Sequence, residues 1–116
     1  MDDIQTPLQR IVELLEKNYE KNVTLHDAAG ACSLSPKYVS RFFKKEMRKN
    51  FSAFRIELRM EHAKKMLLLS TMHVNEIADK VGYGNPEAFM KIFKRSTGLT
   101  PTEYRKTRPS EGSGAV

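Results

Sequence analysis

The sequence predicts an all-α fold of about seven helices, in which two helix-turn-helix lobes are joined by a long central helix. Three observations predict it. Apolar residues recur at helical spacing, capping residues and prolines mark most helix starts, and the order of features in the first half returns in the second. We expect the lobes at residues 1–50 and 70–108, the linking helix at 51–69, and a disordered tail at 109–116.

Composition excludes several classes of protein. With 40% hydrophobic residues, the chain contains no run of about 18 apolar residues that could span a membrane. Its acidic first residues lack the apolar core of a signal peptide. Cys32 is the only cysteine, which argues against an intrachain disulfide and a cysteine-rich zinc site. We therefore expect a cytoplasmic protein with no membrane contact, no metal and no cofactor.

The positive charge is unevenly distributed. The net charge is +6, from 20 Lys and Arg against 14 Asp and Glu. Residues 36–49 contain six bases and one acid, and residues 87–108 contain six bases and two acids. Two basic blocks are typical of two contacts with a polyanion, although two solvated helix faces would explain the charges equally well.

The first predicted helix begins at Thr6 and Pro7, with Gln9 placed for a capping box, and ends in the polar segment 18–22. Its apolar face is broad and comprises Leu8, Ile11, Val12, Leu14, Leu15 and Tyr19. The outer face is acidic and would repel phosphates. This helix is therefore interpreted as a support for the rest of its lobe.

The first helix-turn-helix follows. Thr24 caps a short helix that ends near Ala31, the turn lies at 33–34, and Ser35 with Pro36 opens the next helix. That helix is expected to bury Val39, Phe42 and Phe43. Its opposite face carries Lys37, Ser40, Arg41 and Lys44.

The second helix-turn-helix has the same features in the same order. Its first helix has an apolar face of Val74, Ile77, Ala78 and Val81. Gly82 and Gly84 are expected to allow a sharp turn, Asn85 and Pro86 open the second helix, and Gly98 ends it. Phe89, Ile92 and Phe93 are expected to face inward, and Glu87, Met90, Lys91 and Lys94 outward.

The two motifs form an internal repeat. Ala29 corresponds to Ala78 with an offset of 49. The later pairs have an offset of 50: Pro36 with Pro86, Phe43 with Phe93, Lys44 with Lys94, and Phe54-Arg55 with Tyr104-Arg105. The one-residue difference lies in the turn, where a loop tolerates it best. Between the copies, a helix from about Ser52 to Leu69 has an apolar surface wide enough for two neighbours. A capping box at Thr100 and Glu103 opens the last short helix, with Tyr104 inward.

The stretch I-A-D-K-V-G-Y-G-N-P-E-A-F-M-K-I-F-K-R-S-T-G-L-T-P-T-E-Y-R resembles the signature of the AraC/XylS family of bacterial transcription regulators, and L-S-P-K-Y-V-S-R-F-F-K-K-E matches as well. The similarity covers about Pro7 to Arg105, nearly the whole chain. It departs at 48–50, Arg-Lys-Asn, where such domains often have a glycine, so the chain path there is an open question.

The resemblance implies two lobes whose second motif helices enter adjacent major grooves of double-stranded DNA, and a role as a transcription activator with RNA polymerase as a further partner. The base-facing residues carried over are Lys37, Ser40, Arg41, Glu87, Met90 and Lys91. Residues placed for phosphates are Ser35, Tyr38, Lys44, Lys45, Asn85, Lys94 and Arg95.

Two other classes of function compete with the interpretation as a DNA-binding regulator. A helical interaction domain explains the core but not the paired basic faces. A DNA-repair fusion is the enzymatic option, but its chemistry needs reactive or zinc-bound cysteines that one cysteine cannot supply. We expect no catalytic residue and no small-molecule effector, because lobes of about fifty residues leave little core for a pocket.

Overall fold

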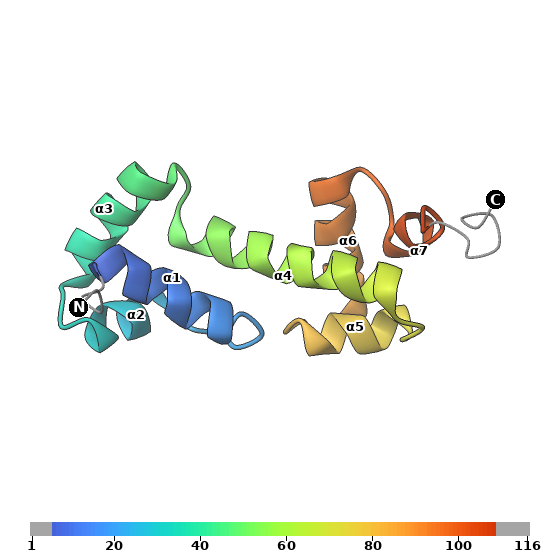
Figure 1. The fold of residues 1–116 in the computed structure, drawn as a ribbon, viewed down its shortest axis with the longest axis horizontal. Helices are drawn as coiled ribbons and strands as arrows, with labels where there is room; N and C mark the ends of the chain where they lie inside the picture. The colour runs from blue at the N-terminus through green and yellow to red at the C-terminus, as the bar shows by residue number, and fades with distance from the viewer. Residues whose placement is uncertain (1–5, 109–116) are drawn as a thin grey trace, which may run out of the picture. The chain divides into compact units, whose positions relative to one another are not determined.

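The computed structural model describes residues 6–108, which form seven α-helices and no strand (Figure 1). The helices are α1 (Pro7–Lys17), α2 (Leu25–Ala31), α3 (Pro36–Met47), α4 (Phe51–Leu69), α5 (Val74–Lys80), α6 (Pro86–Thr97) and α7 (Pro101–Arg105). The predicted all-α fold is confirmed. The tail predicted at 109–116 lies outside the described residues.

Most helices begin where the sequence places a cap. Reciprocal capping boxes open three of them: Thr6 with Gln9, Thr24 with Asp27, and Thr100 with Glu103. In the second box, Asp27 Oδ2 accepts from the N–H of Thr24 at 2.9 Å. This bond, followed by the one involving the threonine hydroxyl, lowers the pKa of Asp27 from its ordinary value. Glu103 is held in the same way by Thr100, and its pKa is lowered too. Both carboxylates therefore stabilise their helices in the ionised form.

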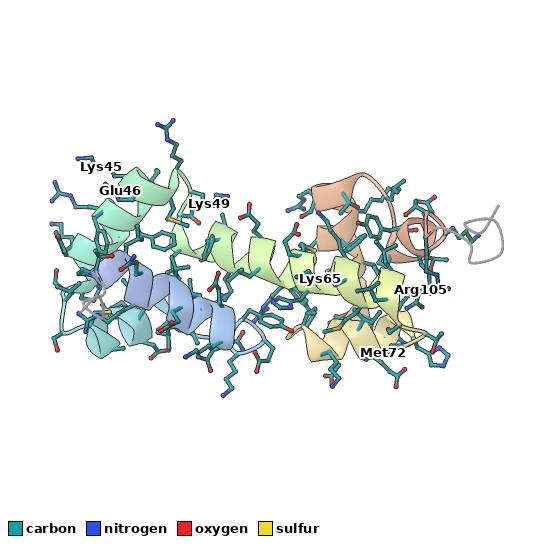
Figure 2. The ribbon with its side chains drawn as sticks, viewed as in Figure 1. Lys45, Glu46, Lys49, Lys65, Met72 and Arg105 are labelled. Atoms are coloured by element: carbon teal, nitrogen blue, oxygen red, sulfur yellow. The ribbon has the colours of Figure 1, made fainter. Side chains whose placement is uncertain are left out.

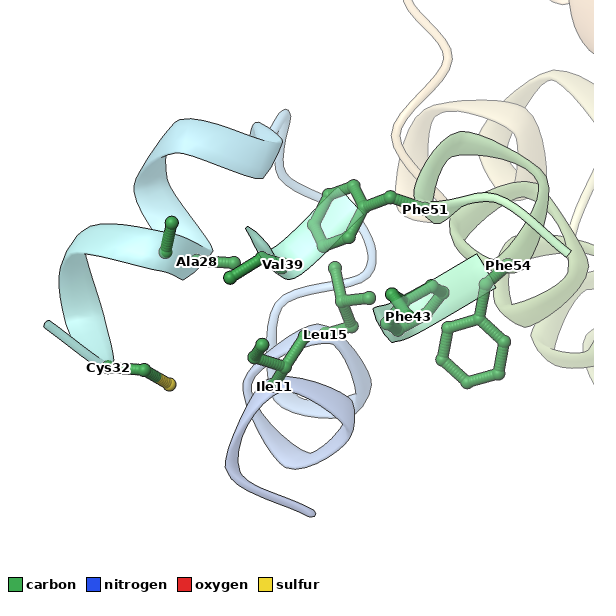
Figure 3. Close-up of a cluster of buried hydrophobic side chains, with 9 residues drawn as sticks. Ile11, Leu15, Ala28, Cys32, Val39, Phe43, Phe51 and Phe54 are labelled. Carbon is green, nitrogen blue, oxygen red and sulfur yellow. The ribbon is translucent and has the colours of Figure 1, made fainter. Parts of the chain in front are cut away.

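The chain divides into two compact units, one ending at Arg59 and the other beginning at Met60, so the boundary lies inside α4. Side chains from α1, α2, α3 and the start of α4 meet in the core of the first unit (Figure 3). The buried residues are Ile11, Leu15, Ala28, Ala29, Cys32, Val39, Phe43, Phe51 and Phe54. Phe42, predicted to be buried, is half-buried and stacks on Tyr38 with ring centroids 5.0 Å apart.

The second unit has a core of the same kind. Its buried apolar residues are Met60, Ala63, Leu67, Ile77, Ala78, Val81, Phe89 and Phe93. Phe93 lies at the centre, with its ring centroid 5.7 Å from that of Phe89 and 5.4 Å from that of Tyr104. In the first unit, the ring centroids of Phe43 and Phe54 are 5.7 Å apart, and this pair is edge-on like the matching pair of Phe93 and Tyr104. The repeat in the sequence is therefore a repeat in packing.

The long helix α4 spans the residues predicted for the linking helix, 51–69. Asn50 Oδ1 accepts a hydrogen bond from Ala53 N at 2.8 Å, which caps the helix so that Phe51 is its first residue. Its first turns contribute to the core of the first unit and its last turns to that of the second. Within residues 6–108, no helix combines the length and apolar character needed to span a membrane.

The turns of the two motifs contain an equivalent hydrogen bond, but glycines occur only in the second turn. Leu34 N donates to Ala29 O at 2.9 Å, and Tyr83 N donates to Ala78 O at 2.8 Å. Ser33 has a φ of 56° in the first turn, and Gly82 has a φ of 103° in the second. In the sharp turn predicted at Gly82 and Gly84, Gly82 takes the angle that favours glycine, and Gly84 has no positive φ.

The open question at 48–50 is answered by the end of α3. Arg48 N donates to Lys44 O at 2.9 Å with a φ of 62°, just as Gly98 N donates to Lys94 O at 2.7 Å with a φ of 85°. Arg48 therefore takes the left-handed conformation that glycine takes in the second motif, and the chain path is preserved.

Candidate nucleic-acid interface

The outer face of α3 presents the side chains that the sequence singled out. Lys37, Ser40 and Arg41 are all exposed, whereas Val39 and Phe43 on the opposite face are fully buried. The pattern follows from the helical period, since residues three or four apart share a face. Figure 2 shows side chains of α3, among them Lys45, reaching away from the ribbon. A rigid core thus holds a polar, basic face toward solvent.

A shallow hollow of about 570 Å³ lies on this face. Its lining combines cations with a stacked aromatic pair and comprises Ser35, Lys37, Tyr38, Arg41, Phe42 and Lys45. Tyr38 is 53% exposed, so its ring forms an apolar strip on an otherwise charged surface. Such a surface can meet both a phosphate and the apolar edge of a sugar or base.

The outer face of α6 is built in the same way but has a different character. Glu87, Met90 and Lys91 are exposed, while Phe89 and Phe93 are fully buried on the other side. A second hollow of about 390 Å³ is lined by Met90, Lys91, Lys94, Arg95 and Thr100. This face has an acid and a thioether where α3 has a lysine and a serine, so the two faces present different chemical groups.

The side chains that cap α3 and α6 use an acceptor oxygen for the cap and keep their hydrogen-bond donors free. Ser35 Oγ accepts from Tyr38 N at 3.1 Å, and Asn85 Oδ1 accepts from Glu87 N at 2.8 Å. Each cap uses an acceptor oxygen, so the hydroxyl proton of Ser35 and the amide protons of Asn85 remain as donors. Both side chains are exposed and can donate to an anion at the helix N-terminus.

The cations of the two faces are available to a partner. Ion pairs join Lys49 to Glu57 at 2.6 Å and Lys64 to Glu61 at 3.0 Å. Neither includes a residue predicted to contact DNA. Lys44, Lys45, Lys94 and Arg95 lie in the last turns of α3 and α6 and are exposed, where a cation is also favoured by the helix dipole.

Three arginines hold the backbone next to the motifs, a role that the sequence did not predict. Arg55 donates to Val23 O, immediately before the cap of α2. Arg105, its counterpart in the repeat, donates to Leu67 O at 3.0 Å and to Ser70 O at 3.2 Å, before α5. Each guanidinium fixes the backbone that leads into a motif. The shared offset of 50 was visible in the sequence, but the partners are backbone carbonyls, which leave no sequence signal.

The third is Arg59, which is only 5% exposed. It donates from Nε to Tyr19 O at 2.7 Å and from Nη2 to Lys21 O at 3.1 Å and Asn22 Oδ1 at 3.3 Å. A buried charge requires such partners. The guanidinium therefore holds the loop between α1 and α2 in place beneath the first motif.

No group of three or more His, Cys, Asp or Glu residues that could hold a metal occurs within residues 6–108. Cys32 is buried at the end of α2, with 8% of its surface exposed. The exposed polar chemistry that the structure brings together is thus that of the two helix faces.

The model of a helix-turn-helix domain matches residues 28–107. Among curated proteins, the regulator YtdP of Bacillus subtilis is 35% identical over 100 residues, which are 86% of this chain and 13% of that protein. AdaA of the same organism, a bifunctional transcriptional activator and DNA repair enzyme, is 33% identical over 101 residues, 87% of this chain and 48% of its own length. The chain therefore spans half or less of these relatives.

Solved structures match over most of both chains. The C-terminal domain of AraT, a response regulator from Geobacillus stearothermophilus, is 31% identical with a TM-score of 0.86, covering 95% of this chain and 93% of that one. An AraC-type regulator from Chromobacterium violaceum is 25% identical with a TM-score of 0.85, covering 91% and 95%. The DNA-binding domain of AdpA, solved with a target DNA, is 23% identical with a TM-score of 0.83, covering 89% and 93%, and shows the shared fold.

The repeated motif, the two-unit helical fold and these matches agree: the chain belongs to the AraC-type helix-turn-helix family, the DNA-binding domains of transcription regulators.

Proposed function

We propose that the domain binds double-stranded DNA sequence-specifically, with α3 and α6 in two adjacent major grooves, and that it activates transcription through this contact. The observation that carries the proposal is the repeat of one exposed polar face on two matched cores. Major grooves on one side of a duplex recur about every 34 Å, so one chain can read an asymmetric site of two boxes.

In the first box, Arg41 is the residue with the sharpest expected role. Its guanidinium can donate two hydrogen bonds to O6 and N7 of one guanine. Lys37 can donate to the same atoms less rigidly, and the hydroxyl of Ser40 adapts to several base edges. All three are exposed on one face of α3. We therefore assign the more selective recognition to this helix.

The second box is read by a different set of groups. Lys91 can donate to guanine, Glu87 can accept from cytosine N4, and Met90 offers an apolar surface for a thymine methyl group. Met90 is 37% exposed. We assign the phosphate contacts to the capping side chains and to the exposed groups beyond the base-facing ones, namely Ser35, Tyr38, Lys44, Lys45, Asn85, Lys94 and Arg95.

The proposal extends to partners. An activator acts on transcription by contact with RNA polymerase, and since bacterial DNA lies in the cytoplasm the domain works there. We assign no enzymatic activity to these residues. AdaA is named as a repair enzyme as well as an activator, but alkyl transfer needs an accessible, activated thiol, and Cys32 is buried.

Selection of bound duplexes from a random DNA pool tests the proposal. An enriched sequence with two boxes is expected, bound much more tightly than the starting pool. Titration of both at several salt concentrations should give a log–log slope of about −0.9 for each phosphate neutralised. Affinity that hardly changes with salt, or a pool that yields no enriched sequence, contradicts the proposal.

A further inference from the structure

The end of α3 holds a side chain in a backbone conformation that L-residues rarely adopt. Arg48 has a φ of 62° and still donates its N–H to Lys44 O, so it stays in register with the helix. The matched residue of the second motif, Gly98, makes the same turn with no side chain to strain. On conformational grounds alone, glycine is the more stable residue at position 48.

Packing does not offset this cost. The side chain of Arg48 is exposed, and no ion pair or hydrogen bond joins it to the described residues. Its neighbour Lys49 differs, because its Nζ lies 2.6 Å from Glu57 Oε2 and is held against α4 (Figure 2). A cation at the C-terminus of a helix is favourable, but Lys44 and Lys45 already supply that charge in the last turn of α3.

The position of Arg48 supplies a reason why arginine, and not glycine, occupies this left-handed site. Arg48 directly follows the last residue of α3, and its N–H bonds to the carbonyl of Lys44, one turn earlier. Lys37, Arg41 and Lys44 belong to the exposed face already described. Arg48 therefore adds a third exposed cation at the end of α3, beside Lys44 and Lys45.

We propose that Arg48 is a further DNA phosphate contact, kept in a left-handed conformation because its guanidinium completes the basic face of α3. The inference rests on the proposed DNA-binding function. A guanidinium can give a phosphate two parallel hydrogen bonds. Because every sequence has the same phosphates, this contact strengthens binding to all duplexes alike.

Two substitutions at this position and one matched control test the inference. Arg48→Gly removes both the charge and the strain. Arg48→Lys keeps both. Ser33→Gly relieves the other left-handed residue of the same motif, with a φ of 56°, and removes no charge. For each variant, affinity is measured on the selected duplex and on random duplex at several salt concentrations, together with the melting temperature.

Arg48→Gly is expected to melt about 2–6 °C higher than the parent, because relief of the left-handed strain exceeds the extra entropy that glycine loses on folding. It should bind both duplexes about threefold or more weakly at low salt. Its salt slope should be smaller by about 0.9, so that a fourfold rise in salt weakens the parent about 3.5-fold more than the variant. Arg48→Lys should stay within about twofold of the parent on both duplexes, since a lysine can also neutralise a phosphate. Ser33→Gly should melt higher without any change in affinity.

If Arg48→Gly binds both duplexes as tightly as a parent whose binding depends steeply on salt, the inference is wrong and the proposed function stands. Loss of affinity for the selected duplex alone would make Arg48 a base contact and also overturn the inference. A parent that shows no salt-dependent duplex binding overturns the proposed function itself.

Discussion

The two helix-turn-helix motifs use different residues at the positions that take a left-handed backbone conformation. Each needs a left-handed residue in its turn and another at the end of its second helix. The first motif uses Ser33 and Arg48, with φ angles of 56° and 62°, and the second uses Gly82 and Gly98, with φ angles of 103° and 85°. L-residues are admitted to a small region near 60°, whereas the wider angles are open to glycine. The first motif therefore adjusts its backbone to carry side chains where the second does not.

The motifs also differ in what they present, though not in how they are supported. Val39 and Phe43 of α3 correspond to Phe89 and Phe93 of α6, and all four are fully buried. The outward positions differ: lysine, serine and arginine at 37, 40 and 41 correspond to glutamate, methionine and lysine at 87, 90 and 91. A common core therefore carries two different exposed faces, and under the proposed function one chain would read an asymmetric site.

The largest expected effect tests the common core. Phe43→Ala and Phe93→Ala should each lower the free energy of unfolding by about 3–5 kcal/mol, because both rings are fully buried among other aromatic side chains. Denaturant titration followed by circular dichroism measures this. Leu69→Ala, at a position 81% exposed, is the control and should change stability by less than about 0.5 kcal/mol. Very unequal costs for the two phenylalanines would break the equivalence of the cores.

The next effect concerns the helix that both units share. Proline at Glu61, in the interior of α4, removes a backbone hydrogen bond and clashes with the preceding turn, at a cost of about 3 kcal/mol or more. If α4 acts as a rigid spacer between the two motifs, Glu61→Pro should reduce affinity for the selected duplex far more than affinity for random duplex. Two basic surfaces without a fixed separation can still meet phosphates.

Glu61→Ala is the matched control for that experiment. It keeps the helix and loses only the exposed pair with Lys64, which contributes little to stability, so both affinities should stay nearly unchanged. Equal loss of both affinities in Glu61→Pro, with circular dichroism showing the units still helical, would show that the two motifs do not depend on a fixed spacer.

Much of this fold could be predicted because its signals are local. Capping boxes such as Thr24 with Asp27 mark helix starts within four residues. Helical spacing predicts that Phe93 faces the core and that Lys94 faces solvent. Residues whose role depends on distant backbone could not be predicted. The burial of Arg59 follows from the carbonyls of residues 19 and 21, which the fold brings to it. The exposed faces were predicted in the same way as the core, but which bases they contact stays a prediction, since that depends on DNA.

The third effect compares residues on the two faces. Arg41→Ala should cost about 1–3 kcal/mol at its own site and relax preference at one or two base pairs, because a bidentate contact to one guanine is lost. Lys94→Ala should weaken binding to all sequences alike and lower the salt slope by about 1. Selection from random DNA with each variant gives the profiles. Identical profiles for the two would remove the distinction between base and phosphate contacts.

The smallest expected effect comes from exchanging the left-handed residues of the two turns, Ser33 and Gly82. Ser33→Gly should stabilise the protein by up to about 1 kcal/mol, because relief of the left-handed strain, about 1–2 kcal/mol, exceeds the extra entropy that glycine loses on folding, about 0.5–1 kcal/mol. The reverse change, Gly82→Ser, should destabilise it by about 1 kcal/mol, because a φ of 103° lies outside the region near 60° that L-residues enter. The two variants are compared by thermal melting under identical conditions. If Gly82→Ser were tolerated as well as serine is at position 33, the second turn could relax to the angle of the first. The second turn would then not require glycine at position 82, and the two turns would not differ in the backbone angles open to them.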